Sequence, residues 1–365
     1  MAANKKGVVE RLDQHMQEML GSNPNAATGE NASRKRKRED ADVCVALDVS
    51  VLSSLILQGF EVYINKKLHT ILEVELYVTS DAHPDPFTHC NEVQKQGGKW
   101  YFHRSGTGGG NTGYRGGSFK GLDIAIGGEG RVGGCLIRTI RRESDKHVIT
   151  GPSKTVDHIL ETCGAKNIQE FVDDTCGGDI DIATCPLLNV KISDSWDPKN
   201  LPKKDPVFVS PRFGLNPINK KGSEDLIWWY LYQPYRFVRQ PSLFSKARVN
   251  TVLGHYQTTG EKLSAQSITH LTGGTLKAAE GYIDLYNKGT KDKKCLEKNF
   301  NSKLNSSTWC TCYGAAMQLF PDNKGLVQKK ARKEEKEGEE EKKDEKQQSP
   351  KKSPVKSIDS YFKKK

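Results

Sequence analysis

The apolar residues of this chain fall in short segments of mixed periodicity. Segments that combine helical and strand-like patterns lie at residues 51–59, 68–79, 121–126 and 134–142. We also predict a helix over 157–163 and short strands over 207–210 and 235–238. Because helices and strands do not alternate regularly, the pattern favours an α+β fold over a doubly wound parallel sheet. No run approaches the roughly 18 apolar residues of a membrane span, so no membrane partner is expected.

The polar ends of the chain restrict the folded part to its middle. We expect a basic, disordered arm over 1–42, a main domain over 43–244, a helical extension packed on it over 245–323, and a disordered Lys/Glu-rich tail over 324–365. The main domain should be a single mixed unit, with a curved, mostly antiparallel sheet flanked by helices. The net charge is +11, and the last 42 residues carry 15 Lys/Arg against 9 Asp/Glu. Basic tails beside a modestly basic body suit a polyanionic partner.

A dense basic run lies in the N-terminal arm. It consists of Arg34, Lys35, Arg36, Lys37 and Arg38. Such a run in a disordered arm is typical of a signal read by a nuclear import receptor, and the alternative is a solubilising charge run. We therefore predict a nuclear location.

A predicted strand over 71–78 places two carboxylates on one face. Side chains alternate along a strand, so Leu72, Val74, Leu76 and Val78 should face a core, while Glu73, Glu75 and Tyr77 face the other way. A carboxylate and a ring two residues apart suit a site that stacks a flat ligand beside a general base. The alternative is an ordinary solvated strand face.

An aromatic and basic segment precedes a glycine-rich stretch. Glycines let a backbone approach phosphates closely, and rings stack on bases, so nucleic-acid contact is one interpretation. A flexible loop beside an aromatic core strand is the other. The candidate DNA-contacting residues here are Tyr101, His103, Arg104, Tyr114 and Arg115.

Two charges interrupt apolar runs further along the chain. Asp123 and Arg138 lie in segments that otherwise look buried, where an unpaired charge is costly. A structural ion pair between them is the plain explanation. Cys310 and Cys312 form a lone CxC without a companion pair, so no metal site is predicted.

Five collinear blocks resemble the alkyladenine (3-methyladenine) DNA glycosylases. The resemblance covers about residues 50–240 and neither the later helical region nor the tails. The blocks are Glu73-Val74-Glu75-Leu76-Tyr77, Thr88-His89, Leu122-Asp123-Ile124 with Leu136-Ile137-Arg138, Gly151-Pro152-Ser153-Lys154, and Pro211-Arg212-Phe213-Gly214 with Gln233-Pro234-Tyr235-Arg236-Phe237.

The resemblance implies a role for each matched residue. Glu75 would activate the water that attacks the sugar C1′, and Arg138 would hold Glu75 and a nearby phosphate in place. Tyr77 and His89 would flank the extruded base, with His83 as a competing candidate for the second ring. Asp123 stands where the family has an asparagine that excludes guanine, so the accepted bases can differ.

The family's wedge tyrosine has no direct counterpart. The matching position falls in Arg115-Gly116-Gly117, and the nearest rings are Tyr114 and Phe119. Either Tyr114 is the wedge on a remodelled loop, or the protein prefers bases that are already unpaired. Lys154, in the fourth block, is a further predicted DNA contact.

The implied activity is a monofunctional base-excision repair glycosylase without metal or cofactor. An alkylated purine already carries positive charge, so a single carboxylate can both activate water and offset charge on the sugar. Alkylated or deaminated purines in damaged DNA are the expected substrates, because such bases are the easiest to extrude. We expect Glu75 to face an opening large enough for one nucleobase and to contact Arg138.

The C-terminal tail ends in a motif that resembles sliding-clamp peptides. Ile358, Tyr361 and Phe362 have the spacing that one helical turn presents to an apolar pocket. A clamp is therefore a predicted partner, and a chance aromatic pair in a low-complexity tail is the alternative. Two other functions stay open: a non-catalytic nucleic-acid-binding protein on the same fold, and a scaffold that acts through the clamp peptide and residues 245–322.

Overall fold

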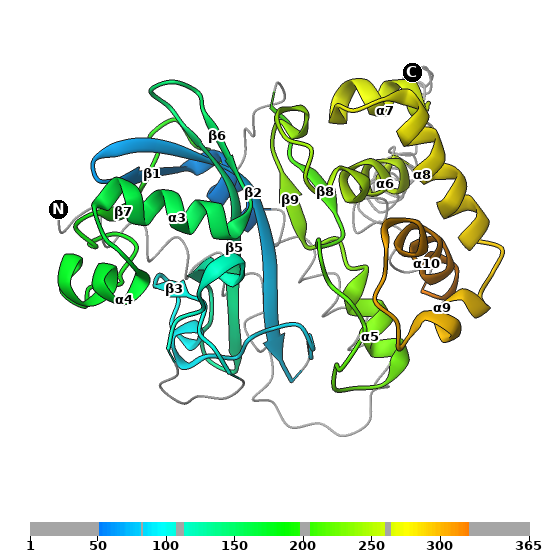
Figure 1. Cartoon of the computed structure of the whole chain (residues 1–365), viewed down its shortest axis with the longest axis horizontal. Helices are drawn as coiled ribbons and strands as arrows, with labels where there is room; N and C mark the ends of the chain where they lie inside the picture. Colours follow the sequence, from blue (N-terminus) through cyan, green and yellow to red (C-terminus); the bar gives the residue numbers. More distant parts are fainter. Residues whose placement is uncertain (1–50, 82, 107–112, 198–204, 260–263, 321–365) are drawn as a thin grey trace, which may run out of the picture. The chain divides into compact units, whose positions relative to one another are not determined.

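A computed structural model describes residues 51–81, 83–106, 113–197, 205–259 and 264–320 (Figure 1). These residues form a mixed α+β domain built on a nine-stranded sheet, in which every strand pair is antiparallel. The predicted fold class is therefore confirmed. Among these residues, no helix combines the length and the apolar character that crossing a membrane requires.

Six strands follow one another across the sheet. In spatial order they are β3 (Trp100–Phe102), β4 (Leu122–Ala125), β5 (Arg131–Arg142), β2 (Lys67–Ser80), β1 (Phe60–Ile64) and β7 (Leu188–Ile192). Three more strands join this path: β6 (Val148–Thr150) pairs with β5, β9 (Arg236–Val238) with β2, and β8 (Phe208–Ser210) with β9. The predicted strands over 207–210 and 235–238 correspond to β8 and β9.

The long strand β2 contains the predicted strand over 71–78. Val74, Leu76 and Val78 enter the main hydrophobic core as expected. Leu72 does not, because it packs in a separate cluster with Phe208 and other apolar residues. This difference coincides with an irregular register between β2 and β5 from Ile71 to Val74. The strict alternation expected from the sequence therefore holds only beyond the irregularity.

Helix α3 (Pro152–Cys163) contains the helix predicted over 157–163. Pro152 begins it and Gly164 ends it, which is the usual placement of these two residue types. Its apolar side contacts β5 and β6 through buried residues such as Val156 and Ile159. Shorter helical segments are η1 (Leu55–Gly59), η2 (Glu92–Lys95), η3 (Gly117–Phe119), α4 (Ile168–Glu170), η4 (Phe171–Thr175) and η5 (Pro241–Leu243).

The described residues between 245 and 320 are mainly helical. After α5 (Glu224–Leu231), the helices are α6 (Arg248–Thr258), α7 (Ala265–Thr272), α8 (Leu276–Gly289), α9 (Lys294–Asn299) and α10 (Ser306–Leu319). Figure 1 shows α6 beside β8 and the yellow-to-brown helices α7 to α10 gathered with it. The extension thus packs on the sheet through α6.

Candidate functional site

One row of side chains crosses five strands in register. Tyr101 of β3 pairs with Asp123 of β4, and Asp123 pairs with Leu136 of β5. Leu136 pairs with Glu75 of β2, which also pairs with Arg236 of β9. Directly paired residues project from the same face of a sheet. Three sequence-predicted site residues, Tyr101, Asp123 and Glu75, therefore share one face, which we call the polar face.

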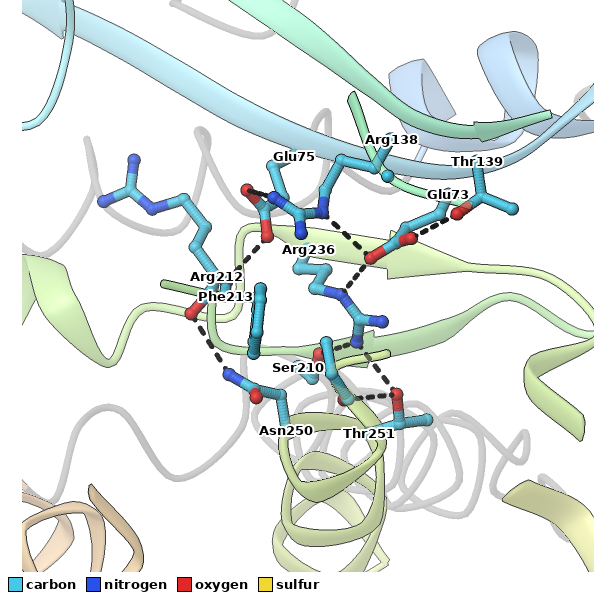
Figure 2. Close-up of polar contacts among 12 residues, drawn as sticks. Glu73, Glu75, Arg138, Thr139, Ser210, Arg212, Phe213, Arg236, Asn250 and Thr251 are labelled. Atoms are coloured by element: carbon cyan, nitrogen blue, oxygen red, sulfur yellow. Dashed lines mark hydrogen bonds and ion pairs between the residues drawn. The ribbon is translucent and has the colours of Figure 1, made fainter. Parts of the chain in front are cut away.

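Glu75 lies at the centre of a closed hydrogen-bond cluster (Figure 2). Its Oε2 accepts from Arg138 Nη1 at 3.1 Å and from the Tyr77 hydroxyl at 2.9 Å. Its Oε1 accepts from the backbone N–H of Phe213 at 2.6 Å. The expected contact between Glu75 and Arg138 is therefore present. Tyr77, which the sequence places on the same face of the strand, donates a hydrogen bond directly to Glu75.

Glu73 provides a second carboxylate beside the first. It accepts from Arg138 Nε at 3.0 Å, from Arg236 Nε at 2.7 Å and from the Thr139 hydroxyl at 2.6 Å (Figure 2). Burial by itself raises the pKa of Glu73, but the guanidiniums of Arg236 and Arg138 outweigh it and lower the pKa. Arg138 therefore bridges Glu73 and Glu75, and its interaction with these two carboxylates raises its own pKa despite burial.

The expected ion pair between Asp123 and Arg138 is wrong. Arg138 instead uses its guanidinium on Glu73 and Glu75, which lie on the neighbouring strand. Asp123 contacts two other side chains, described below. The segments around Asp123 and Arg138 are buried, as the sequence predicts. The two charges do not pair with each other, because each has its partners elsewhere in the fold.

Tyr77 is held between its carboxylate and a buried guanidinium. The Arg212 guanidinium carbon lies 4.5 Å from the centre of the Tyr77 ring. Arg212 also binds Asp85, at 2.6 and 3.2 Å, and both side chains are fully buried. Burial and then the Glu75 carboxylate raise the pKa of Tyr77 well above its usual value. The phenol therefore stays protonated as a hydrogen-bond donor to Glu75.

Asp123 is held by neutral and titratable partners. Its Oδ1 lies 2.7 Å from His103 Nε2, and its Oδ2 accepts from Gln94 Nε2 at 2.9 Å. Two glycines make room for this group. A Cβ on Gly134 would lie 2.4 Å from Asp123 Oδ2, and one on Gly121 would lie 2.6 Å from His103 Nδ1. The sequence places Asp123 here, but it gives no sign of Gln94 or His103 as its partners.

The two histidine candidates for the second ring have different surroundings. His83 is buried, and its ring packs against Tyr230 and Tyr235. The His89 ring packs edge-on against His103, with ring centres 4.5 Å apart, although the residue as a whole is exposed. Burial of the ring and then the charge of His103 lower the pKa of His89 to about 4. Only His89 therefore lies beside Asp123.

The predicted DNA contacts divide into buried and accessible residues. Tyr101 and His103 are buried, so neither is an open surface contact in this structure. Tyr114 is partly buried and makes a cation–π contact with Arg104, whose guanidinium carbon lies 4.3 Å from the ring centre. Arg115 is half-buried and Lys154 is exposed in the first turn of α3.

Phe119 differs from the other rings of this region. It is 75% exposed and ends η3, on the connection between β3 and β4. The neighbouring Gly117 carbonyl accepts from Ser153 at the start of α3. Of the two rings nearest the expected wedge position, Phe119 is therefore the one free to contact another molecule.

The expected opening above Glu75 is not found. The Glu75 side chain is 0% exposed. A pocket of about 450 Å³ is lined by Trp100, Arg104 and Tyr114, and another of about 600 Å³ is lined by Arg115, Lys120 and Asp157, among other residues. Neither includes Glu75. In the described part of the chain, the carboxylate is covered by its own partners, chiefly Tyr77, Arg138 and the Phe213 backbone.

The described residues contain no group of three or more His, Cys, Asp or Glu side chains placed to hold a metal ion. Cys310 and Cys312 are buried in α10, and the Cys312 sulfur lies 3.2 Å from that of Cys295. These thiols belong to the core of the helical extension rather than to the polar face.

Sequence reasoning missed several residues of the cluster. Glu73, Arg212 and Arg236 received no role, although the matched blocks contain all three. The available signal was the one used for Arg138, namely a charge within an otherwise apolar run. Asp85 and Gln94 lie in polar segments, where that signal does not exist.

Two predicted sites fall outside the described residues. The basic run at 34–38 and the clamp-like residues Ile358, Tyr361 and Phe362 belong to these segments. Both remain predictions from the sequence.

Comparison with known proteins gives one distant relative. No family model matches the chain. The chain is 28% identical over 192 residues to an uncharacterized protein of Acanthamoeba polyphaga mimivirus, a match that covers 49% of this chain and 79% of the viral protein. Because that relative is itself uncharacterized, the likeness assigns neither a family nor an activity.

Proposed function

We propose that the protein is a DNA base-excision glycosylase that hydrolyses the N-glycosidic bond of alkylated or deaminated purines. One observation carries the proposal: Glu75 accepts hydrogen bonds from both Arg138 and Tyr77, on a face shared with Asp123. These are the residues to which the sequence resemblance gives the water-activating, positioning and base-contacting roles. No metal or cofactor is part of the proposal.

The cluster has suitable electrostatics for this chemistry. A carboxylate has about four lone-pair positions, and the three described donors leave one for a water molecule. Arg138 holds the carboxylate in a fixed position, as a general base requires. Because the site is shielded from solvent, its charge also acts strongly on a sugar that becomes cationic as the bond breaks.

Entry of the substrate requires the cluster to open. Tyr77 is half-buried, and its hydroxyl covers Glu75 Oε2. We propose that the extruded base displaces this contact as it stacks on the Tyr77 ring. Stacking returns about 1–3 kcal/mol per base, comparable to the hydrogen bond to a charged acceptor that is lost.

In our proposal, duplex DNA contacts the surface formed by η3 and the first turn of α3. Phe119, an exposed ring on the connection between β3 and β4, replaces Tyr114 as the wedge that enters the stack. Lys154, in the first turn of α3, would contact a phosphate next to it. The basic tails would add affinity that depends on salt concentration.

Full burial of Glu75 favours a second candidate function. A non-catalytic nucleic-acid-binding protein would need the Glu75 cluster only for stability, and a carboxylate with 0% exposure fits that role. This alternative predicts binding with a steep salt dependence and no release of base.

Base release from defined duplexes distinguishes the two functions. Purified full-length protein is incubated with duplexes that contain 3-methyladenine, hypoxanthine or ethenoadenine, and the free base is measured. We expect release that falls at least about 10³-fold in Glu75→Gln, because the general base is lost. Glu297→Gln, the same substitution at an exposed position of α9, is the matched control. Absence of release, or release that persists unchanged in Glu75→Gln, contradicts the proposal.

The wedge assignment has its own test. Phe119→Ala should slow base release from a duplex about tenfold and leave release from the same single strand unchanged, because only paired bases need a wedge. Equal rates for the variant and the wild type on the duplex would exclude Phe119 from this role.

Nuclear location and clamp binding complete the proposal. Deletion of residues 350–365 should abolish binding to a sliding clamp and leave base release from a short duplex unchanged. A pure scaffold predicts the reverse, in which the deletion abolishes function and Glu75→Gln has no effect.

Replacement of residues 34–38 by alanines should abolish nuclear accumulation of a fluorescent fusion.

A further inference from the structure

An exposed lysine lies on the same connection that holds Glu75. The connection between β8 and α5 contains Phe213, whose backbone N–H donates to Glu75, and Lys220 follows it before α5 begins. Lys220 is exposed as a residue, but its amine nitrogen lies 4.8 Å from the centre of the buried Phe87 ring. The amine is therefore held over an apolar ring and does not extend freely into solvent.

The Phe87 ring links this amine to the ring that we propose as the platform for the base. The guanidinium carbon of Arg212 lies 5.3 Å from the centre of the Phe87 ring and 4.5 Å from the centre of the Tyr77 ring. Asp85 accepts from the Phe87 backbone N–H at 3.0 Å and also binds Arg212. Because a lysine stem is flexible, the Lys220 amine can move from this position towards a sugar whose base stacks on Tyr77.

The Lys220 amine has the surroundings of a nucleophile. Among the described residues, it forms no hydrogen bond or ion pair. Burial of the amine lowers the pKa of Lys220; the Asp85 carboxylate opposes this shift, and the charges of Arg212 and Arg115 add to it. Lysines that attack carbonyl groups are typically activated by an apolar surface or by a neighbouring cation, because both favour the uncharged amine. Lys220 has both kinds of neighbour.

His89 supplies an uncharged imidazole near this amine. Burial of the ring, followed by the charges of His103, Arg115 and Lys220, lowers the pKa of His89 to about 4. The imidazole is therefore neutral near pH 7 and can accept a proton. Both His89 and Lys220 are exposed as residues, so a DNA strand can approach them although Glu75 itself is covered.

We infer that Lys220 is the nucleophile of a second activity, in which the protein cleaves the DNA strand at the abasic site that base removal leaves, with His89 as the base. This inference rests on the proposed function, because excision produces the abasic site. It departs from the monofunctional activity that the sequence resemblance implies. The opened sugar of an abasic site presents an aldehyde at C1′, and a lysine amine forms an imine with such a carbonyl.

The reaction is balanced without an oxidant or a reductant. The Lys220 amine adds to the C1′ aldehyde, and loss of one water gives a protonated imine. His89 takes a proton from C2′, the electron pair of that bond forms a C2′=C3′ double bond, and the C3′–O bond breaks with its pair leaving on the phosphate. Water then hydrolyses the imine, which restores the Lys220 amine and leaves an unsaturated aldehyde on the cleaved strand. His89 returns its proton to solvent.

Borohydride trapping tests the assignment on a substrate that needs no glycosylase. Full-length protein is incubated with a duplex that contains a preformed abasic site, and sodium borohydride reduces any imine to a stable covalent adduct. We expect the adduct to map to Lys220 by mass spectrometry. Lys220→Arg keeps the charge and removes the nucleophile, so adduct and strand cleavage should both fall at least about 100-fold. Lys221→Arg, the same substitution at the adjacent exposed lysine, is the matched control.

His89→Gln separates the two steps of the reaction. The adduct should still form, because imine formation does not need a base at C2′, whereas strand cleavage should slow about 100-fold. Unchanged cleavage in this variant would contradict the role of His89.

The inference and the proposed function can fail separately. An adduct that maps to another lysine, or equal adduct yields in wild type and Lys220→Arg, would overturn the inference. Base release that depends on Glu75, without any adduct at Lys220, overturns the inference alone. An adduct at Lys220 without base release supports the strand-cleaving step and overturns the glycosylase proposal. Absence of both overturns both.

Discussion

The carboxylates of Glu75 and Asp123 lie in one row of the sheet, yet their partners differ in kind. Glu75 and its neighbour Glu73 are held by the permanent charges of Arg138 and Arg236. Asp123 is held instead by the amide of Gln94 and the imidazole of His103. A guanidinium does not lose its proton, so the charge of an arginine is permanent. We call the Glu75 end, which arginines hold, the locked end, and the Asp123 end the unlocked end.

Removal of an arginine from the locked end should give the largest effect. Arg236 is fully buried and binds Glu73 together with the hydroxyls of Ser210 and Thr251. Arg236→Met leaves these groups short of a partner and should reduce the free energy of unfolding by about 3–5 kcal/mol. Urea denaturation measures the loss. The double variant with Glu73→Gln should recover part of it, and a loss below about 1 kcal/mol for the single variant would show that the charges are not coupled.

A bulkier residue beneath the unlocked end should have an intermediate effect. The Cβ of Gly134→Ala would lie 2.4 Å from Asp123 Oδ2 and 2.8 Å from Gln94 Nε2. The carboxylate and the amide must both shift, at a cost of about 1–3 kcal/mol in the free energy of unfolding. Gly116→Ala, where a Cβ would meet nothing within 4 Å, is the matched control. Equal stabilities of the two variants would contradict the close packing described here.

Neutralising Asp123 should have a smaller effect. The two carboxylate oxygens of Asp123 now face Gln94 Nε2 and His103 Nε2. In Asp123→Asn an NH₂ group replaces one of these oxygens, so one hydrogen bond is weakened. We expect the free energy of unfolding to fall by about 1 kcal/mol, the usual net worth of one hydrogen bond. A loss as large as that of Arg236→Met would mean that both ends are locked alike.

Acid should reveal a still smaller contribution from His89. Its folded pKa of about 4 lies below its ordinary value of 6.5, so the unfolded chain binds the proton first. The corresponding stability is fully present above about pH 6.5 and is lost as the pH falls towards 4. His89→Gln should therefore flatten this part of the curve of unfolding free energy against pH. Parallel curves for wild type and variant would place the His89 ring in open solvent.

The sequence predicts the scaffold better than it predicts the contacts. The apolar pattern identifies β2, α3, β8, β9 and the C-terminal helices, because burial of a face leaves a local periodic signal. The contact between Glu75 and Arg138 came from the resemblance. Local patterns do not contain the pairing of Arg212 with Asp85, 127 positions away, since such pairs depend on register and packing. The same reason explains why Asp123 was assigned the wrong partner.

The helical extension reaches the candidate site through two side chains of α6, Asn250 and Thr251. Asn250 donates to the carbonyls of Pro211 and Arg212, on the loop whose next backbone N–H holds Glu75 (Figure 2). A protein cut after residue 244 would keep every strand and lose this brace. The helices thus support the loop that holds Glu75, and the smallest unit able to preserve the carboxylate's geometry must extend beyond residue 244.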